Sequence, residues 1–403
     1  MTIDRLLSRR ELLGWLASLL LVSGLLVVTQ FASDDPDSAL YAAISARLAQ
    51  TPPARWIAPE WWGNWDSEGL FHEHPAGVFL LPTALGAIGI PAAQAAYIVG
   101  ITAGLACLLI IGTLVARVTS VTDGRLVLIL LQFMPVAFIF RIRANHEYPM
   151  LFALVALLVG LDAVRTSWRH SWIVAIALTA ALLVKGVFLV ILLVGAGYWI
   201  LINPTLQRGS SVRPILACVF GLVVMLGVAA AYDLQYERVT GERFWRAYWE
   251  RQLGPLTLAA PTTGTGGATL AHHLLFYAAR VLWHPAPWSL AILATCWTRR
   301  GRVLSWWQSA TEPARRGILF ALAFAVTAVV ALSPASRFAE RYVFSANYAI
   351  ATLGAVVSLH AWPRWRAWLE RLDARVPGLP VLTWLALMLL RLTIGPLLPR
   401  ISG

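Results

Sequence analysis

The only lysine in the chain, Lys185, lies inside an apolar run that extends from Leu178 to Val194. Every other basic side chain is an arginine. An ammonium group at membrane depth costs about 2.5–3.5 kcal/mol on insertion scales, so it usually faces a polar cavity or a charged partner. Lysine is also a compact cation that suits a phosphate. Two interpretations are therefore open: an anion-binding lysine, or a helix end whose side chain reaches the interface.

Further charged residues stand beside predicted helix ends, and the topology described below collects them at one membrane face: Asp34, Asp35, Asp37, Glu73, Glu147, Arg337, Glu340 and Arg341. Carboxylates and cations gathered in this way suit an anionic substrate carried by a lipid. One carboxylate could act as a base while the cations hold a phosphate. The simpler alternative is that outer loops of any membrane protein carry charges. Arg337 and Glu340 could then be a surface pair worth about 0–1 kcal/mol.

Cysteines and histidines give weaker signals. The three cysteines lie far apart in apolar segments without metal or redox spacing, which is typical of buried small hydrophobic residues: Cys107, Cys218 and Cys296. Four histidines are weak candidates for a divalent metal site: His72, His74, His272 and His273. Their spacing is not diagnostic, and the last two could be plain interfacial residues. We therefore predict no cofactor and leave metal as an open alternative.

The composition indicates a membrane protein. The chain has 403 residues, of which 59% are hydrophobic and only 13% are charged, whereas a soluble domain carries about 25% charged residues. Apolar stretches of membrane-spanning length recur from end to end. A β-barrel would instead show short alternating strands. We expect an all-α polytopic membrane protein that forms a single transmembrane domain over residues 1–403.

We predict eleven transmembrane helices, at roughly 12–31, 93–115, 125–141, 148–164, 168–184, 187–202, 214–232, 282–297, 317–333, 343–360 and 379–397. The segment 76–91 is apolar but broken by Pro82 and Pro91, so we expect an interfacial or re-entrant helix there. The first span follows Arg5, Arg9 and Arg10 and lacks a small-residue cleavage site. It is predicted to be a retained helix with a cytoplasmic N-terminus.

The distribution of charge supports this topology. Alternating the sides from a cytoplasmic start places eighteen arginines and seven acidic residues in the cytoplasm, so eleven of the twelve net positive charges lie there. This is the positive-inside pattern. It accounts for the net charge of +12 without a nucleic-acid partner.

One junction admits two topologies. Residues 168–202 could form one long span, or two short passes that turn at Lys185-Gly186. The second interpretation places both flanking arginine pairs, Arg165/Arg169 and Arg208/Arg213, on the cytoplasmic side. We prefer it because it follows the positive-inside pattern, and it places Lys185 at the outer face.

Two sizeable loops then lie outside. The first, residues 32–75, is acidic and aromatic, and we expect interfacial helices within it. The second, residues 233–281, contains a stretch rich in threonine and glycine between Thr257 and Gly267. Such a composition suits a mobile lid over a site or a plain linker. No internal repeat is evident, which counts against an inverted-repeat transporter.

Five blocks of the chain resemble, in the same order, motifs of the GT-C superfamily of membrane glycosyltransferases, and the resemblance is closest to the branch of protein O-mannosyltransferases and aminoarabinose (ArnT-like) transferases. The blocks are Asp35-Pro-Asp37-Ser-Ala-Leu-Tyr41-Ala, His72-Glu73-His74-Pro75-Ala76, Arg143-Ala-Asn-His146-Glu147-Tyr-Pro149-Met-Leu, Lys185-Gly186-Val187 and Ser336-Arg337-Phe-Ala-Glu340-Arg341-Tyr342-Val-Phe. The match covers about residues 1–360. The chain departs from the motifs where Ser38 replaces a glutamate, His74 a lysine and Glu147 an aspartate.

The resemblance implies an enzyme that moves a sugar from a polyprenyl-phosphate carrier to an acceptor, with inversion, at the periplasmic face of a bacterial inner membrane. Asp37 would be the general base, with Asp35 as the alternative, because Asp37 could instead cap the helix that begins there. Glu147 would orient acceptor or donor. The phosphate would be bound by Lys185, Arg337, Arg341, Tyr342 and His74, and the substrates would also contact Asp34, Tyr41, Glu73 and His146.

Two other functions remain open on the sequence. A transporter or flippase for an anionic lipid or solute would need polar residues at mid-membrane, where the spans show only Gln132, Arg391 and, near an end, Asp162. An O-antigen ligase would keep the enzyme class but use a diphosphate-linked oligosaccharide. The acceptor, whether glycolipid, protein or cell-wall polymer, is not specified by the residues, nor are the sugar and the length of the carrier.

Overall fold

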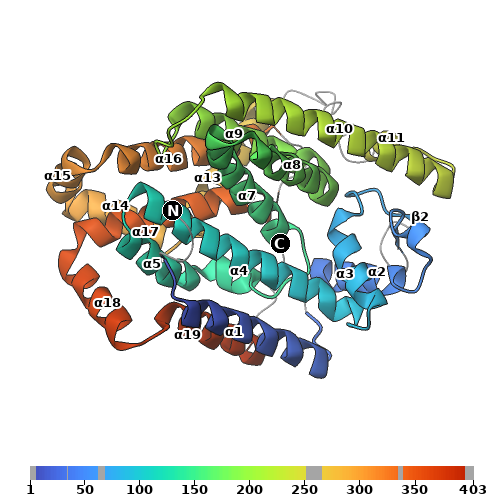
Figure 1. Cartoon of the computed structure of the whole chain (residues 1–403), viewed down its shortest axis with the longest axis horizontal. Helices are drawn as coiled ribbons and strands as arrows, with labels where there is room; N and C mark the ends of the chain where they lie inside the picture. Colours follow the sequence, from blue (N-terminus) through green and yellow to red (C-terminus); the bar gives the residue numbers. More distant parts are fainter. Residues whose placement is uncertain (1–5, 34, 62–68, 251–265, 335–338, 395–403) are drawn as a thin grey trace.

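The computed structural model describes residues 6–33, 35–61, 69–250, 266–334 and 339–394. These residues are almost entirely helical (Figure 1). The only sheet among them is a two-stranded antiparallel one, in which β1 (Glu60–Trp61) pairs with β2 (Gly69–Leu70). The predicted all-α polytopic fold is therefore confirmed.

Seven helical stretches of the described residues are long and apolar enough to cross a bilayer. They are α1 (Arg9–Val28), α4 (Ala92–Val118), α7 (Glu147–Thr166), the stretch Trp168–Ile202, α10 (Val212–Thr240), α16 (Glu312–Leu332) and the stretch Glu340–Ala361, which contains η7 (Glu340–Val343) and α17 (Phe344–Ala361). An eighth span results if α18 (Pro363–Arg375) and α19 (Leu379–Ile394), which meet at 89°, count as one.

All eleven predicted spans fall on helices, but the count of eleven is not confirmed by length and composition. The predicted span 125–141 is divided into α5 (Val121–Leu130), η3 (Leu131–Phe133) and α6 (Pro135–Phe140). Pro135 cannot donate a backbone hydrogen bond, which explains the break. The span predicted at 282–297 is the short helix α14 (Trp288–Thr298).

The two loops that the sequence predicted to lie outside are more helical than a loop description suggests. The first contains α2 (Pro36–Leu48), as expected, and η2 (Pro53–Arg55). The predicted interfacial segment is α3 (Gly77–Ala87). The second loop holds the end of α10, α11 (Phe244–Tyr248) and most of α13 (Gly266–Trp283), and its glycine-rich residues 257–265 lie outside the described residues.

The stretch Trp168–Ile202 turns back on itself and consists of η4 (Trp168–His170), α8 (Ser171–Lys185), η5 (Gly186–Phe188) and α9 (Leu189–Ile202). Its two ends meet beside the end of α7: Trp199 Nε1 donates to Asp162 Oδ1 over 2.9 Å. Arg213, at the start of α10, donates to the carbonyl of Thr166 over 3.1 Å. A straight helix of 35 residues would hold these ends about 50 Å apart. The predicted hairpin at Lys185-Gly186 is therefore confirmed.

The molecule has two distinct ends (Figure 1). We call the end that carries α2, α3 and β2 the site end, and the opposite end, with α15 (Arg300–Ser309) and α18, the basic end. An aromatic cluster lies at the site end, where α2, α3, α10 and α11 meet: Tyr41, Phe71, Phe79, Tyr232, Tyr236, Phe244 and Tyr248 are among its buried members. The large hydrophobic core fills the space between the helices that connect the two ends.

Candidate functional site

The start of α2 separates the roles of the two candidate aspartates. Asp35 is the N-cap: its Oδ2 accepts hydrogen bonds from the Ser38 N–H over 3.0 Å and from the Ser38 hydroxyl over 2.5 Å. Its Oδ1 lies 3.2 Å from Arg143 Nη2. The alternative in which Asp37 caps this helix is therefore wrong, because Asp35 holds that position. Asp37 lies in the first turn with its carboxylate available for other contacts.

Asp37 forms an ion pair with Arg341, which η7 contributes from the other half of the chain. Both side chains are about one-third exposed, at 34% and 28%. Arg341 Nε also lies 3.8 Å from Glu147 Oε1. Arg341 thus bridges two of the three carboxylates that the sequence predicted to be catalytic, Asp37 and Glu147.

Glu147 and Lys185 form the buried part of the site, each 3% exposed. Lys185 Nζ, at the end of α8, lies 3.4 Å from Glu147 Oε1 at the start of α7. The same ammonium faces the rings of Phe188 and Tyr342, at 4.4 and 5.1 Å from their centres. A buried cation requires such partners. The other oxygen of Glu147, Oε2, has no hydrogen-bond partner among the described residues.

A small cavity of about 20 Å³ adjoins these groups and is lined by Glu147, Lys185, Arg341, Tyr342 and Ser345 together with apolar side chains. This volume is sufficient for about one water molecule. The cavity lies where α7, the hairpin and η7 meet, so three separated segments contribute charged groups to one space.

Two histidines lie beside Glu147. His146 Nε2 is 3.2 Å from Glu147 Oε1, and the rings of His146 and His74 contact each other edge to face, with 4.8 Å between their centres. Burial lowers the pKa of His74 well below its ordinary value, and the charges of His146 and Lys185 act in the same direction. The Nδ1 atoms of both histidines are buried without partners among the described residues.

Tyr41 lies next to these two histidines and is influenced by the charge of Glu73. The Tyr41 ring lies 5.9 Å from that of His146. Burial raises the pKa of Tyr41 well above its ordinary value, and the negative charges of Glu73 and Glu147 add to this effect. The structure therefore brings Tyr41, His74 and His146 together beside Glu147, and the charge of Glu73 acts on Tyr41.

Other predicted residues lie elsewhere. His72 Nε2 hydrogen-bonds the Tyr236 hydroxyl over 2.9 Å, and His273 Nδ1 lies 3.1 Å from the carbonyl of Ser333. No group of three potential metal ligands exists among the described residues, so the weak metal hypothesis for His72, His74, His272 and His273 finds no support there. Asp34 and Arg337 lie outside the described residues.

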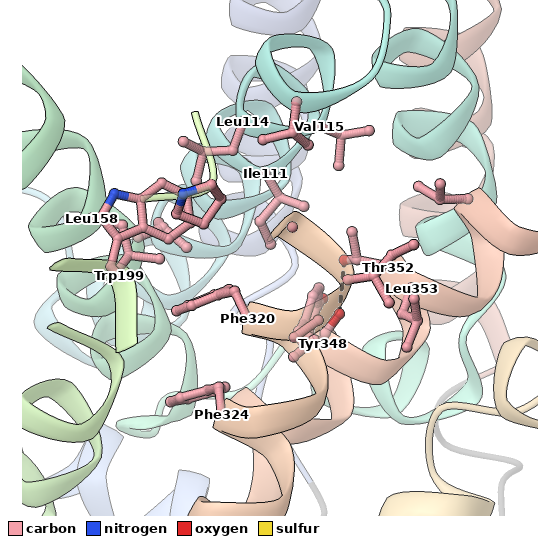
Figure 2. A pocket seen from close by; sticks show the side chains of 18 of the residues that line it. Ile111, Leu114, Val115, Leu158, Trp199, Phe320, Phe324, Tyr348, Thr352 and Leu353 are labelled. Carbon is pink, nitrogen blue, oxygen red and sulfur yellow. Dashed lines mark hydrogen bonds between the residues drawn. The ribbon is translucent and has the colours of Figure 1, made fainter. Parts of the chain in front are cut away.

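A larger apolar cavity of about 130 Å³ extends toward the basic end (Figure 2). Side chains from α4, α7, α9, α16 and α17 turn toward this space, among them Ile111, Trp199 and Phe320. Ser345 lines both this cavity and the small one beside Lys185. An apolar space thus begins next to the charged groups.

Two residues that contact the site were not predicted from the sequence. Arg143 pairs with Asp35; it stood in one of the motif blocks but was given no role. Tyr248, in α11, contacts the Lys185-Gly186 turn through its hydroxyl. No local pattern in the sequence around Tyr248 specifies a contact with a turn sixty residues away.

Among the comparisons with known proteins, the one with solved structures identifies the fold. No family model matches the chain, and no curated protein matches it in sequence. Among solved structures, the chain is similar to ArnT from Cupriavidus metallidurans in the apo state, with 14% identity and a TM-score of 0.61 over 95% of this chain and 76% of that one. The same enzyme bound to undecaprenyl phosphate gives 14% identity and a TM-score of 0.62 over 96% and 77%. The chain therefore shares the fold of this ArnT, which agrees with the fold that the motif blocks predicted.

Proposed function

We propose that this protein is a glycosyltransferase that moves a sugar from a polyprenyl-phosphate donor to an acceptor at the periplasmic face of the inner membrane. One observation carries the proposal: Asp37, Arg341, Glu147 and Lys185 form a continuous charged chain beside the start of an apolar cavity. A lipid phosphate needs cations and an apolar space next to each other. The fold shared with an ArnT that binds undecaprenyl phosphate supports the same class of ligand.

Asp37 is the proposed general base. Its carboxylate takes the proton of the acceptor hydroxyl, and the acceptor oxygen attacks the anomeric carbon of the donor sugar. The bond between that carbon and the phosphate oxygen breaks in the same displacement, so the configuration at the anomeric carbon inverts. Polyprenyl phosphate leaves with the electron pair. An ordinary aspartate is ionised at neutral pH, so its contribution rests on position.

Lys185 and Arg341 are the proposed partners of the leaving phosphate. Both cations contact Glu147 Oε1, and Arg341 also pairs with Asp37. A phosphate that enters between them exchanges these carboxylate contacts for its own, which releases Asp37 toward the acceptor. Charge on the phosphate grows as the sugar bond breaks, so fixed cations stabilise the transition state more than the bound donor. Tyr342, His74 and Arg337 are proposed to assist at the same phosphate.

The apolar cavity is the proposed site for the first part of the polyprenyl tail. Its lining along α17 runs from Ser345 to Val356, a rise of about 16 Å. The tail is already in an apolar medium in the bilayer, so its contribution to donor affinity comes from packing against this lining rather than from leaving water. The charged groups act on the reacting bond.

The function is tested with purified protein in liposomes and a panel of radiolabelled sugars on polyprenyl phosphate, with a membrane extract as acceptor. We expect release of free polyprenyl phosphate and a labelled product whose anomeric configuration is opposite to that of the donor. No turnover with any donor, together with facilitated flux of lipid or solute, would instead identify a transporter. Retention of configuration would reject the single displacement.

The side of the reaction has its own test. Val187→Cys, next to the turn, is proposed to react with an impermeant thiol reagent added from the periplasmic side of intact spheroplasts. An introduced cysteine at Arg302, on α15 at the basic end, is the matched control and should react only after lysis. Labelling of the Val187→Cys protein only from the cytoplasmic side would contradict the proposed orientation.

A further inference from the structure

The turn that carries Lys185 is closed over by an aromatic side chain. Gly186 has φ of 57°, a backbone conformation that favours glycine. A Cβ atom added there would lie 2.4 Å from the Tyr248 hydroxyl oxygen. Glycine is thus required twice at this position, once for the backbone and once for the approach of Tyr248.

Tyr248 is joined to the turn by a hydrogen bond. The Val187 N–H donates to Tyr248 Oη over 3.0 Å. The tyrosine is 4% exposed, and its ring stacks on Phe244 with 5.7 Å between centres. Val187 lies in the first turn of η5, where backbone N–H groups lack partners within the helix. The turn is therefore fixed by a side chain that cannot readily move.

The corner between α10 and α11 holds a second segment of the site in the same way. Tyr232 Oη accepts a hydrogen bond from the Ala76 N–H over 3.1 Å and donates to the Ile57 carbonyl over 2.9 Å. Ala76 is the last residue of the block that contains His74. One aromatic corner thus holds both the Lys185 turn and the His74 segment from outside.

We propose that Tyr248 is a positioning residue for the transfer reaction. Its hydroxyl fixes the Gly186-Val187 peptide, and this contact places the Lys185 ammonium where the donor phosphate leaves. The inference rests on the proposed function of Lys185 and adds a residue from the second loop to it. Lys185 has φ of −143° and ψ of 12°, outside the helical region, so neighbouring helical hydrogen bonds do not fix its direction.

The test is a double-mutant cycle between Tyr248→Phe and Lys185→Met, with kcat and donor KM measured for all four proteins. Tyr248→Phe keeps the ring and removes only the acceptor oxygen. We expect kcat to fall about tenfold, with donor KM within about twofold, because misplacement of the cation by a fraction of an ångström weakens transition-state stabilisation most. In the Lys185→Met background we expect the same change to have less than about twofold effect.

Tyr198→Phe is the matched control, because it also removes one tyrosine hydroxyl, which bonds Thr327 Oγ1 over 2.8 Å. It should leave kcat within about twofold of wild type. The proposal would be overturned if Tyr248→Phe lowered kcat as much in the Lys185→Met protein as in wild type. It would also be overturned if Tyr248→Phe left the kcat of the wild-type background unchanged. Polyprenyl-phosphate affinity is measured in the same proteins, so that the turn is tested even if no donor is turned over. A Tyr248→Phe loss of affinity that persists in Lys185→Met would equally reject the positioning role.

Discussion

Helix α7 carries a buried carboxylate near each end, and the two differ in how they are satisfied. Asp162, 2% exposed, accepts hydrogen bonds from Trp199 Nε1 and Thr205 Oγ1 over 2.9 and 3.0 Å, while its second oxygen lies 3.5 Å from Arg117. Glu147, 3% exposed, directs all its described contacts to one oxygen and leaves the other without a partner. Fifteen residues, or about 22 Å, separate them along the helix.

The difference indicates that the two carboxylates have different roles, one in the stability of the fold and one in ligand binding. A buried carboxylate with both oxygens engaged stabilises the fold. Here Asp162 joins α7 to Trp199 on α9, to Thr205 in the loop after α9 and to Arg117 on α4. A buried carboxylate that shares one oxygen between cations and leaves the other unpaired is costly for stability. A bound ligand can supply the missing partner of such a group. The site end, with Glu147, His74 and His146, has this character, whereas Asp162 at the other end of α7 does not.

The variant with the largest expected effect on kcat is the one that removes the proposed base, Asp37. Asp37→Asn should lower kcat by about 10³-fold because the amide cannot take the acceptor proton. Asp35→Asn is the matched control: it retains a capping oxygen, and we expect less than about tenfold loss of rate with at most about 1 kcal/mol loss of stability. If kcat fell by the larger factor in Asp35→Asn and not in Asp37→Asn, Asp35 would be the base.

The contrast on α7 itself is tested by Glu147→Gln beside Asp162→Asn, with activity normalised to folded protein. Glu147→Gln should reduce kcat by about 10²-fold, because Lys185 and Arg341 lose their shared anion and shift. Asp162→Asn should lower stability by about 2–4 kcal/mol, since Arg117 loses its partner, while folded protein keeps its turnover. Equal effects on turnover from both variants would break the comparison.

The apolar cavity between the two ends gives a smaller effect. Ala321→Phe places a ring in the lining of the cavity and should raise KM for a long-chain donor about tenfold, with little change for a donor with a short tail. Leu322→Phe, one residue along and 42% exposed, is the control and should change neither. If Ala321→Phe changed KM equally for the long-chain and the short-tailed donor, the tail would not bind in this cavity.

The smallest expected effect concerns protonation of His74. Because its folded-state pKa lies below the unfolded value of about 6.5, the unfolded state binds the proton more readily. The contribution of His74 to stability is complete above that value and is lost as pH falls toward the folded pKa. His74→Gln should therefore lose fewer degrees of Tm than wild type between about pH 7.5 and about pH 5.5. A steeper loss in the variant would contradict the buried, neutral state of this imidazole.

Much of the fold could be predicted because hydropathy and charge are local properties of the sequence. The arginine pairs Arg165/Arg169 and Arg208/Arg213 specified the hairpin, and the Asp162–Trp199 hydrogen bond confirms it. The division of the span 125–141 was missed because Pro135 starts a new helix within an unbroken apolar run.

The site could be predicted by residue type but not by role. Asp35 and Asp37 are the same residue two positions apart, and only the hydrogen bond from Ser38 shows which one caps α2. Tyr248 and the Lys185 turn meet through folding of segments far apart in sequence, which no local pattern encodes. The four histidines were grouped by type alone, and the structure separates them because His72 faces Tyr236 while His74 faces His146.

The most direct test of the central claim measures turnover of a polyprenyl-phosphate-linked sugar by wild type, Asp37→Asn and Asp162→Asn in one liposome preparation, with the folded fraction determined for each. The account predicts release of polyprenyl phosphate by wild type and by folded Asp162→Asn at similar rates, and about 10³-fold slower release by Asp37→Asn. Equal rates for wild type and Asp37→Asn would contradict it, because Asp37 would then not be the base of the transfer reaction.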